Sequence, residues 1–179
     1  MSEQIEKFSA AERQLRSAIV MFLNREDPVT VHTVIGAALQ IFVDLNQRKG
    51  RGGVAFNCKY VRKERMKEWH GYLTKSRNFF KHADHDPEGT TNFSPRINEV
   101  LLFEAVVHYD QLTDTPIKES QVYKLIFFSR NPDLLHDGVV KQHLLTALGD
   151  GLIGRDDDFQ IFKDVIDRTP DGLKIPLTF

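Results

Sequence analysis

The fold is decided by residues 27–45, which read DPVTVHTVIGAALQIFVDL. Asp27 is a preferred helix-capping residue, and Pro28 loses no hydrogen bond at the first position of a helix. Apolar residues then recur every three or four positions, the spacing of a helix face that packs against a core. The members of this face are Val31, Val34, Ile35, Ala38, Ile41, Phe42 and Leu45. The stretch therefore predicts a long core helix.

The same kind of helix start recurs along the chain. A capping residue precedes proline at Ser94-Pro95, Thr115-Pro116 and Asn131-Pro132, and Ser9 has Glu12 three positions later, the spacing of a capping box. An apolar pattern of helical period follows these starts. Together they predict an all-α protein, with helices that begin at Ser9 and Pro28 and then run over about 59–83, 95–111, 117–129, 133–148 and 157–167.

These elements indicate how the chain is organised. We predict an antiparallel bundle of about four helices over residues 9–112 and a smaller helical part over residues 115–179 that packs on it, or one continuous domain made of both. A basic, glycine-rich connector over residues 48–57 separates the second helix from the third. No repeat of about 20–50 residues is present, which argues against a solenoid.

Composition and length restrict the class of protein. The chain has 179 residues, of which 41% are hydrophobic and 27% charged, as in soluble globular domains. With a single cysteine, Cys58, it forms no internal disulfide, which favours a reducing compartment. The N-terminus lacks the apolar segment of a signal peptide, and no uninterrupted apolar run is long enough to cross a bilayer. We therefore expect a cytoplasmic protein with no membrane partner.

The net charge of −1 conceals an uneven distribution. Residues 48–81 hold 11 basic and 2 acidic residues, a net charge of +9, whereas residues 1–47 carry −2 and residues 82–179 carry −8. A basic segment of this density attracts a polyanion such as RNA, and it can equally face an acidic surface of this chain or of a partner protein. The candidate RNA-binding residues are Lys59, Arg62, Lys63, Arg65, Lys67, Lys75 and Lys81.

Residues 77–82, which read RNFFKH, are the string with the clearest chemical potential. Arg77 carries a permanent positive charge on a planar group that suits phosphate. A histidine such as His82 can accept or return a proton, and Asn78 adds a neutral polar group. These groups suffice for attack of an RNA 2′-hydroxyl on the adjacent phosphate, with His82 as general base and Arg77 stabilising charge on the phosphoryl oxygens.

The HEPN superfamily, the higher eukaryote and prokaryote nucleotide-binding domains, has a short motif near the end of a helix in a small bundle. The motif is an arginine, a polar residue directly after it, and a histidine five positions after the arginine. Arg77, Asn78 and His82 fit it residue by residue, and the chain resembles the superfamily over about residues 9–112. The resemblance implies an RNA-binding homodimer that needs no cofactor, either a metal-independent ribonuclease of toxin or defence type or a non-catalytic module. The acidic balance of the whole chain departs from that of a free RNA-binding protein.

Other interpretations remain open for the same residues. Arg77 and His82 are also typical of a helix end, where cations are favourable and Asp84 or Asp86 can pair with them. In a different function class, the basic helix docks on an acidic partner protein without catalysis. The cluster of His82, His85 and Asp86, with help from histidines on neighbouring helices, also has a spacing that suits a metal ion.

A further enzyme class is suggested by His136-Asp137, which resembles the His-Asp step of the HD phosphohydrolase family. That resemblance implies a metal-dependent phosphohydrolase in which His108 and Asp164 supply the remaining ligands. The helix start at Asn131-Pro132 lies only a few residues before His136, whereas the family's pair sits inside an established helix. We therefore keep this interpretation as an alternative.

Overall fold

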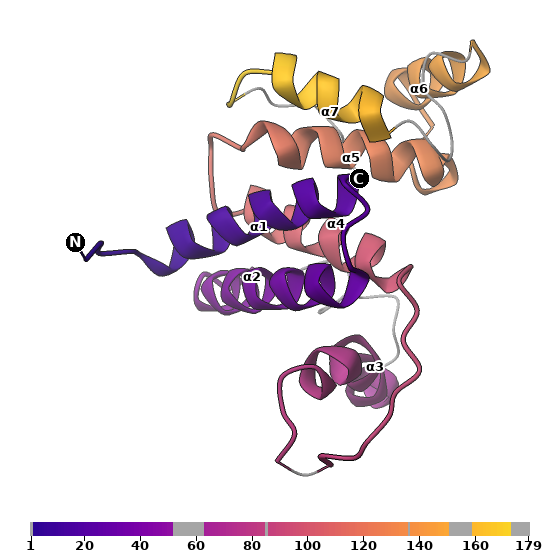
Figure 1. Cartoon of the computed structure of the whole chain (residues 1–179). Coiled ribbons are helices and arrows are strands. Elements are labelled where there is room, and N and C mark those ends of the chain that lie inside the picture. Colours follow the sequence, from indigo (N-terminus) through magenta and orange to yellow (C-terminus); the bar gives the residue numbers. More distant parts are fainter. Residues whose placement is uncertain (1, 52–62, 85, 136, 151–158, 173–179) are drawn as a thin grey trace.

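The computed structural model describes residues 2–51, 63–84, 86–135, 137–150 and 159–172 (Figure 1). Over these residues the chain is all-α and contains no strand, which confirms the predicted fold class. The elements are α1 (Lys7–Leu23), α2 (Pro28–Arg48), the short 3-10 helix η1 (Lys63–Arg65), α3 (Met66–Phe79), α4 (Ile97–Asp110), α5 (Lys118–Arg130), the 3-10 helix η2 (Pro132–Leu134), α6 (Val139–Gly149) and α7 (Phe159–Arg168).

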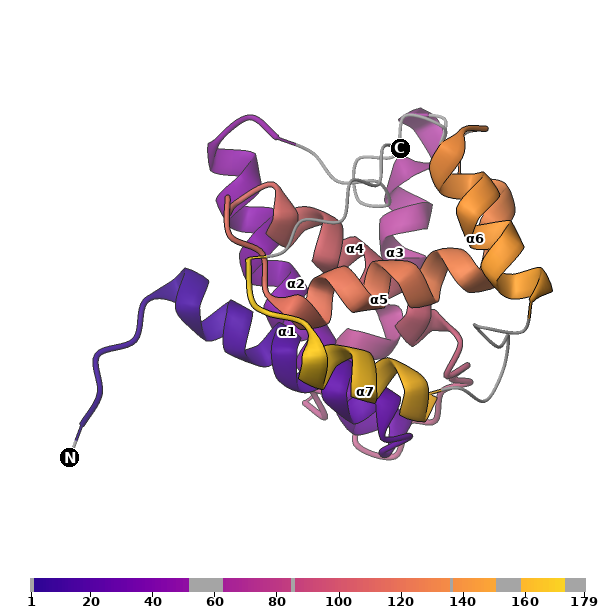
Figure 2. The same ribbon diagram turned by 90° about the horizontal axis from the view of Figure 1, so that it is seen from above.

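Four helices pack together at the centre of the molecule. α1 contacts α2, α4 and α5, and α4 also contacts α2 and α5 (Figures 1 and 2). The bundle therefore includes α5, which lies beyond the predicted boundary between residues 112 and 115. The basic helix α3, expected as a member of the bundle, contacts only α2 and η1 among the described elements. It lies at the edge of the molecule, on the side opposite to α6 and α7 (Figure 1).

The hydrophobic core is continuous from α1 to α7. Its largest fully buried side chains include Phe42 of α2, Tyr109 of α4 and Phe128 of α5. The ring of Phe103 on α4 stacks on Phe127 of α5, with ring centroids 3.9 Å apart. The connection between α4 and α5 thus joins two helices of one packed unit.

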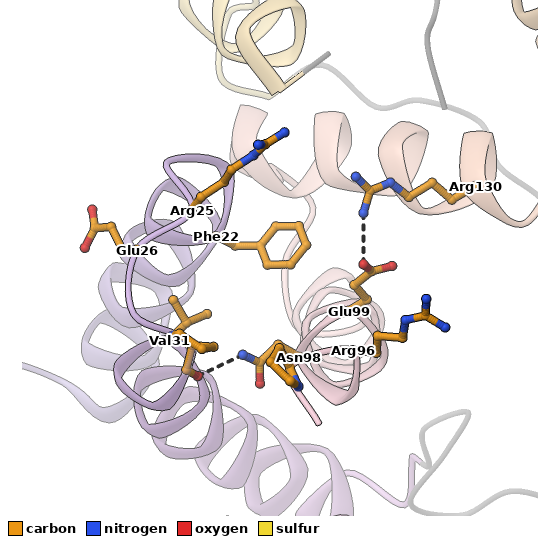
Figure 3. A pocket seen from close by; sticks show the side chains of 10 residues that line it. Phe22, Arg25, Glu26, Val31, Arg96, Asn98, Glu99 and Arg130 are labelled. Atoms are coloured by element: carbon orange, nitrogen blue, oxygen red, sulfur yellow. Dashed lines mark hydrogen bonds and ion pairs between the residues drawn. The ribbon is translucent and has the colours of Figure 1, made fainter. Parts of the chain in front are cut away.

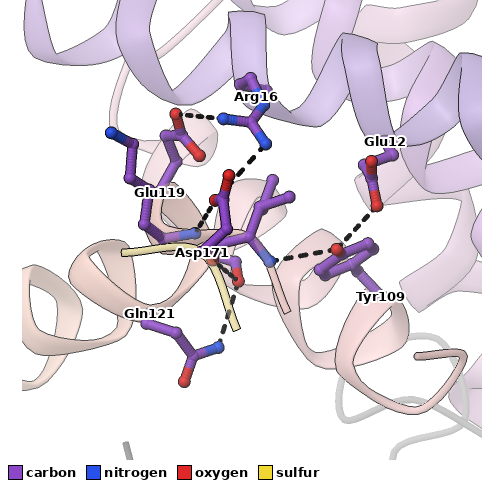
Figure 4. Close-up of polar contacts among 9 residues, drawn as sticks. Glu12, Arg16, Tyr109, Glu119, Gln121 and Asp171 are labelled. Atoms are coloured by element: carbon purple, nitrogen blue, oxygen red, sulfur yellow. Dashed lines mark hydrogen bonds and ion pairs between the residues drawn. The ribbon is translucent and has the colours of Figure 1, made fainter. Parts of the chain in front are cut away.

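Polar contacts also join α1, α4 and the start of α5 (Figure 4). The Tyr109 hydroxyl donates to the Glu12 carboxylate at 2.8 Å and accepts from the backbone N–H of Ile117 at 3.1 Å. Arg16 of α1 donates to the carboxylate of Glu119 on α5 at 2.8 Å. Burial, with the bond to Glu12 as the second cause, raises the pKa of Tyr109. The phenol therefore stays protonated and keeps its bond to the carboxylate.

The helix starts show which capping signals act through a side chain. Asp27 caps α2 as predicted, because its carboxylate accepts from two backbone N–H groups of the first turn. α4 and α5 begin at Ile97 and Lys118 without such a side-chain cap. At α4, backbone carbonyls of a preceding 3-10 turn bind the first N–H groups instead. Asn131-Pro132 opens only the 3-10 helix η2, and α1 begins shortly before the predicted start at Ser9.

α2 is also, among the described helices, the one that is long and apolar enough to cross a membrane. Its apolar residues are interrupted by polar ones, so no continuous run marks it in the sequence. Core helices of proteins share these properties, and α2 packs here against α1, α3 and α4. The absence of a membrane partner and a cytoplasmic location therefore stay predictions.

Candidate functional site

The candidate site lies at the C-terminal end of α3, where the chain turns toward α4. α3 ends at Phe79, a few residues before its predicted end. Beyond this point the backbone N–H groups of Phe80 and His82 still bond to the carbonyls of Ser76 and Asn78, at 3.0 and 3.2 Å. His82 therefore lies on a last, irregular turn and stays close to Asn78.

Asn78 and His82 line the same pocket, which has a volume of about 710 Å³. Both side chains are exposed, so the imidazole can meet a ligand from solvent. The other lining residues are Lys75, Phe79, Asp84, Asp86, Thr90 and Thr91. The Thr91 hydroxyl is buried and has no hydrogen-bond partner in the described part of the chain. The pocket thus combines donors, acceptors and one aromatic ring around the predicted general base.

Arg77 packs against α2 instead of lining this pocket. Its aliphatic part lies on Gly36, where an added Cβ would be 2.7 Å from Arg77 Cδ. Its guanidinium donates to Oε1 of Gln40 at 2.8 Å. Burial lowers the pKa of Arg77 below its ordinary value, and the carboxylate of Asp44 acts in the opposite direction. One chain alone does not bring the two predicted catalytic residues into one pocket.

His32 of α2 is fully buried near Arg77. Its Nδ1 lies 2.8 Å from Oδ1 of Asn98, and Nδ2 of Asn98 donates to the carbonyl of Pro28 at 2.9 Å. Because Pro28 orients the amide of Asn98, Nδ1 of the neutral imidazole is the donor and Nε2 is an acceptor. That Nε2 has no hydrogen-bond partner among the described residues. The rings of Phe80 and Phe93 enclose the imidazole, with centroid distances of 5.6 and 5.1 Å.

The environment of His32 predicts a pH-dependent stability. Burial is the main cause that lowers the pKa of His32; the bond to Asn98 opposes it, and the charge of Arg77 adds to it. Below about pH 6.5 the unfolded chain binds a proton that the folded chain does not, so the free energy of unfolding falls as the pH decreases. We expect urea denaturation between about pH 7.5 and about pH 5 to show this loss, and His32→Gln to reduce its slope. Parallel pH profiles for the two proteins would contradict this assignment.

The basic residues predicted to bind RNA are exposed where the structure describes them. Three lysines of this set are exposed on α3 and directly after it: Lys67, Lys75 and Lys81. Arg65 is also exposed and forms an ion pair with Glu68 at 2.7 Å. Lys59 and Arg62 lie outside the described residues, as does the side chain of Lys63. The three lysines, together with the paired Arg65, are therefore the part of the predicted RNA-binding surface that the structure describes.

The described residues do not assemble the predicted metal ligands. His108 is fully buried on α4, whereas Asp137 and Asp164 are exposed, one before α6 and one on α7. Within the described ranges, no group of three or more His, Cys, Asp or Glu side chains could hold a metal ion. His136 and His85 lie outside those ranges. The HD-type phosphohydrolase and the His82 metal cluster therefore gain no support here.

A second pocket, of about 410 Å³, lies where the turn between α1 and α2 meets the start of α4 (Figure 3). Phe22 and Val31 form part of its apolar wall, and Asn98 lines it from α4. Arg130 of α5 donates to Glu99 at 2.9 Å, and both residues line the pocket. Its charged lining residues are three arginines and two carboxylates: Arg25, Arg96, Arg130, Glu26 and Glu99.

Three residues of α2 that lie near Arg77 belong to no motif in the sequence: His32, Gly36 and Gln40. They follow each other at intervals of four, so they share one face of the helix. One signal for them exists, because glycine inside a helix is less favourable than alanine by about 1 kcal/mol and often marks a close approach. Which side chain approaches Gly36 depends on how α3 packs, and periodicity along α2 does not report that.

No family model, curated protein or solved structure matches this chain. The resemblance to the HEPN superfamily therefore rests on Arg77, Asn78 and His82 and on their helical context. The function has to be inferred from the chemistry of α3 and of the α2 face beneath it.

Proposed function

We propose that this protein is a HEPN-like RNA-binding homodimer that cleaves RNA without a metal ion. His82 acts as general base, Arg77 binds the phosphate, and Asn78 provides a further polar contact. The supporting observation is the exposure and the hydrogen bonding of the His82 and Arg77 side chains. His82 is exposed in a polar pocket, and Arg77 is held half-buried by the neutral amide of Gln40 with no ion pair among the described residues. The imidazole of His82 is accessible to a substrate, and the guanidinium of Arg77 has no direct carboxylate partner among the described residues.

The proposed reaction is an in-line displacement at phosphorus. His82 removes the proton from a 2′-hydroxyl, and the 2′-oxygen forms a bond to the adjacent phosphorus. The bond from phosphorus to the 5′-oxygen breaks, and that oxygen takes up a proton. Arg77 stabilises the negative charge that develops on the non-bridging oxygens. The products are a 2′,3′-cyclic phosphate and a 5′-hydroxyl.

A second copy of the chain completes the proposed site. Arg77 contacts α2 and does not line the pocket of His82, so the two groups do not share a pocket within one chain. The family resemblance implies a groove across a homodimer. In our proposal, Arg77 of one chain faces His82 of the other across that groove. A two-fold axis repeats each contact, so such a dimer holds two composite sites.

Combining two inactive variants tests the composite site. In a homodimer of Arg77→Ala or of His82→Ala, each of the two composite sites lacks one of its two catalytic side chains. A mixed dimer, purified through two different tags, joins the intact arginine of one chain to the intact histidine of the other in one of its two sites. We expect it to recover about half of the wild-type rate on a fluorogenic RNA. A mixed dimer as inactive as its parents would place each site within a single chain and contradict the proposal.

A further inference from the structure

The side-chain amide of Gln40 lies between the guanidinium of Arg77 and the carboxylate of Asp44. Nη1 of Arg77 donates to Oε1 of Gln40 at 2.8 Å, and Nε2 of Gln40 donates to Oδ1 of Asp44, also at 2.8 Å. Gln40 is the hydrogen-bond partner of Arg77 among the described residues, and no carboxylate of those residues forms an ion pair with it. Asp44 therefore acts on the guanidinium through the amide of Gln40 and not by a direct ion pair, and the guanidinium keeps further N–H donors besides the one that binds Gln40.

Gly36 lets the aliphatic part of Arg77 lie directly on α2. A Cβ at Gly36 would be 2.7 Å from Cδ and 2.9 Å from Cγ of Arg77, too close for packed atoms. Both are middle atoms of the side chain, so a larger residue would displace the whole arginine from Gln40. Gly36, Gln40 and Asp44 follow each other at intervals of four and form one strip along the helix. We call these three residues the α2 strip.

We infer that the α2 strip positions Arg77 to bind the phosphate group. By placing the neutral amide of Gln40 next to the guanidinium, the strip also sets the affinity of Arg77 for that anion. Gln40 occupies one donor of the guanidinium, and the remaining N–H groups can bind two phosphate oxygens together. A carboxylate in place of the amide would hold the side chain equally well but would compensate its charge. This inference rests on the proposed function, because it takes phosphate as the ligand of Arg77. It adds Gln40 and Gly36 as positioning residues.

Exchanging the amide and the carboxylate tests the inference. Gln40→Glu combined with Asp44→Asn keeps the net charge and the sizes of both side chains, but it places the carboxylate directly against Arg77. We expect this double variant to bind inorganic pyrophosphate about tenfold more weakly than the wild type, with an unchanged or higher thermal midpoint. The binding is followed in the full chain by the NMR signal of the Arg77 Nε–H group during titration.

Two glycine variants provide a matched pair. Gly36→Ala introduces the Cβ that meets Arg77, whereas nothing lies within 4 Å of a Cβ added at Gly71 of α3. Alanine favours both helices, so neither change is expected to unfold the protein. We expect Gly36→Ala to weaken pyrophosphate binding by about tenfold and Gly71→Ala to bind like the wild type.

The outcomes separate this inference from the proposed function. Wild-type affinity for pyrophosphate in the exchange variant or in Gly36→Ala overturns the inference, and so does a wild-type Arg77 signal that pyrophosphate does not move. RNA cleavage is measured on the same proteins. If the variants weaken pyrophosphate binding but even the wild type cleaves no RNA, the role of the α2 strip stands and the nuclease proposal fails. If wild type and variants cleave RNA equally well, the nuclease proposal stands and the inference fails.

Discussion

We expect His82→Ala to lower the rate of RNA cleavage by about 10²–10⁴-fold, because the attacking 2′-hydroxyl then lacks its general base. Arg77→Ala should lower the rate by about 10²–10³-fold, because charge on the phosphoryl oxygens is no longer offset. The wild-type rate should be unchanged by EDTA, since the proposed reaction uses only side chains. Cleavage is measured with a fluorogenic RNA, and mass spectrometry of the products should show the 2′,3′-cyclic phosphate.

His143→Ala is the control for the loss of a histidine. His143 is also exposed, but it lies on α6, on the opposite side of the molecule from α3 (Figure 1). We expect this variant to cleave at the wild-type rate. Cleavage that EDTA abolishes, or that both Arg77→Ala and His82→Ala leave intact, would contradict the nuclease proposal. Salt-sensitive binding to an acidic protein without RNA turnover would instead favour the alternative, in which the basic helix docks on a partner.

α2 shows what the sequence can predict about this fold. Of the seven predicted core positions, Val31, Ile35, Ala38 and Phe42 are buried and the other three are partly buried. Asp27 forms the predicted cap through its side chain. Both features depend on spacing within one helix, and periodicity reports such spacing directly.

α5 shows why the members of the bundle could not all be predicted. Its sequence, KESQVYKLIFFSR, has no single apolar face, which is not the pattern of a core helix. In the structure Glu119, Gln121 and Lys124 are nevertheless buried, because they bond to Arg16 of α1 or to Asp110 of α4. Those partners come from other helices, so the burial of α5 depends on tertiary contacts that its own sequence does not contain.

The sequence predicts which residues form the candidate site, but it does not predict the directions in which their side chains point. Five positions on a helix separate Arg77 and His82 by about 140°, so they need either a groove between them or an unwound last turn to meet. α3 does end before His82, which leaves that residue beside Asn78. Arg77 turns toward α2 because Gly36 leaves room for it there. The direction of the Arg77 side chain therefore depends on the absence of a side chain at Gly36 of α2.

Removing residues 113–179 is expected to unfold the remaining chain, because α5 is part of the central bundle. α5 buries five apolar side chains: Val122, Tyr123, Ile126, Phe127 and Phe128. Burial of one such side chain contributes about 1.5–3 kcal/mol, so their sum is comparable with the total stability of a domain, about 5–15 kcal/mol. The truncation also removes the partners of α4 and α1, since Phe103 loses its stacked ring and Arg16 its carboxylate.

Circular dichroism of the 1–112 fragment should therefore show much less helix than the full chain and no cooperative thermal transition. The full chain should unfold in one transition, because its core is continuous from α1 to α7. A chain that lacks only residues 2–5, which are exposed before α1, should keep the wild-type midpoint and serves as the control for shortening. A cooperative, helical 1–112 fragment would contradict this view and make that part a domain of its own. Since Arg77 is held by α2 and α2 by its neighbours in the bundle, loss of α5 should also abolish pyrophosphate binding.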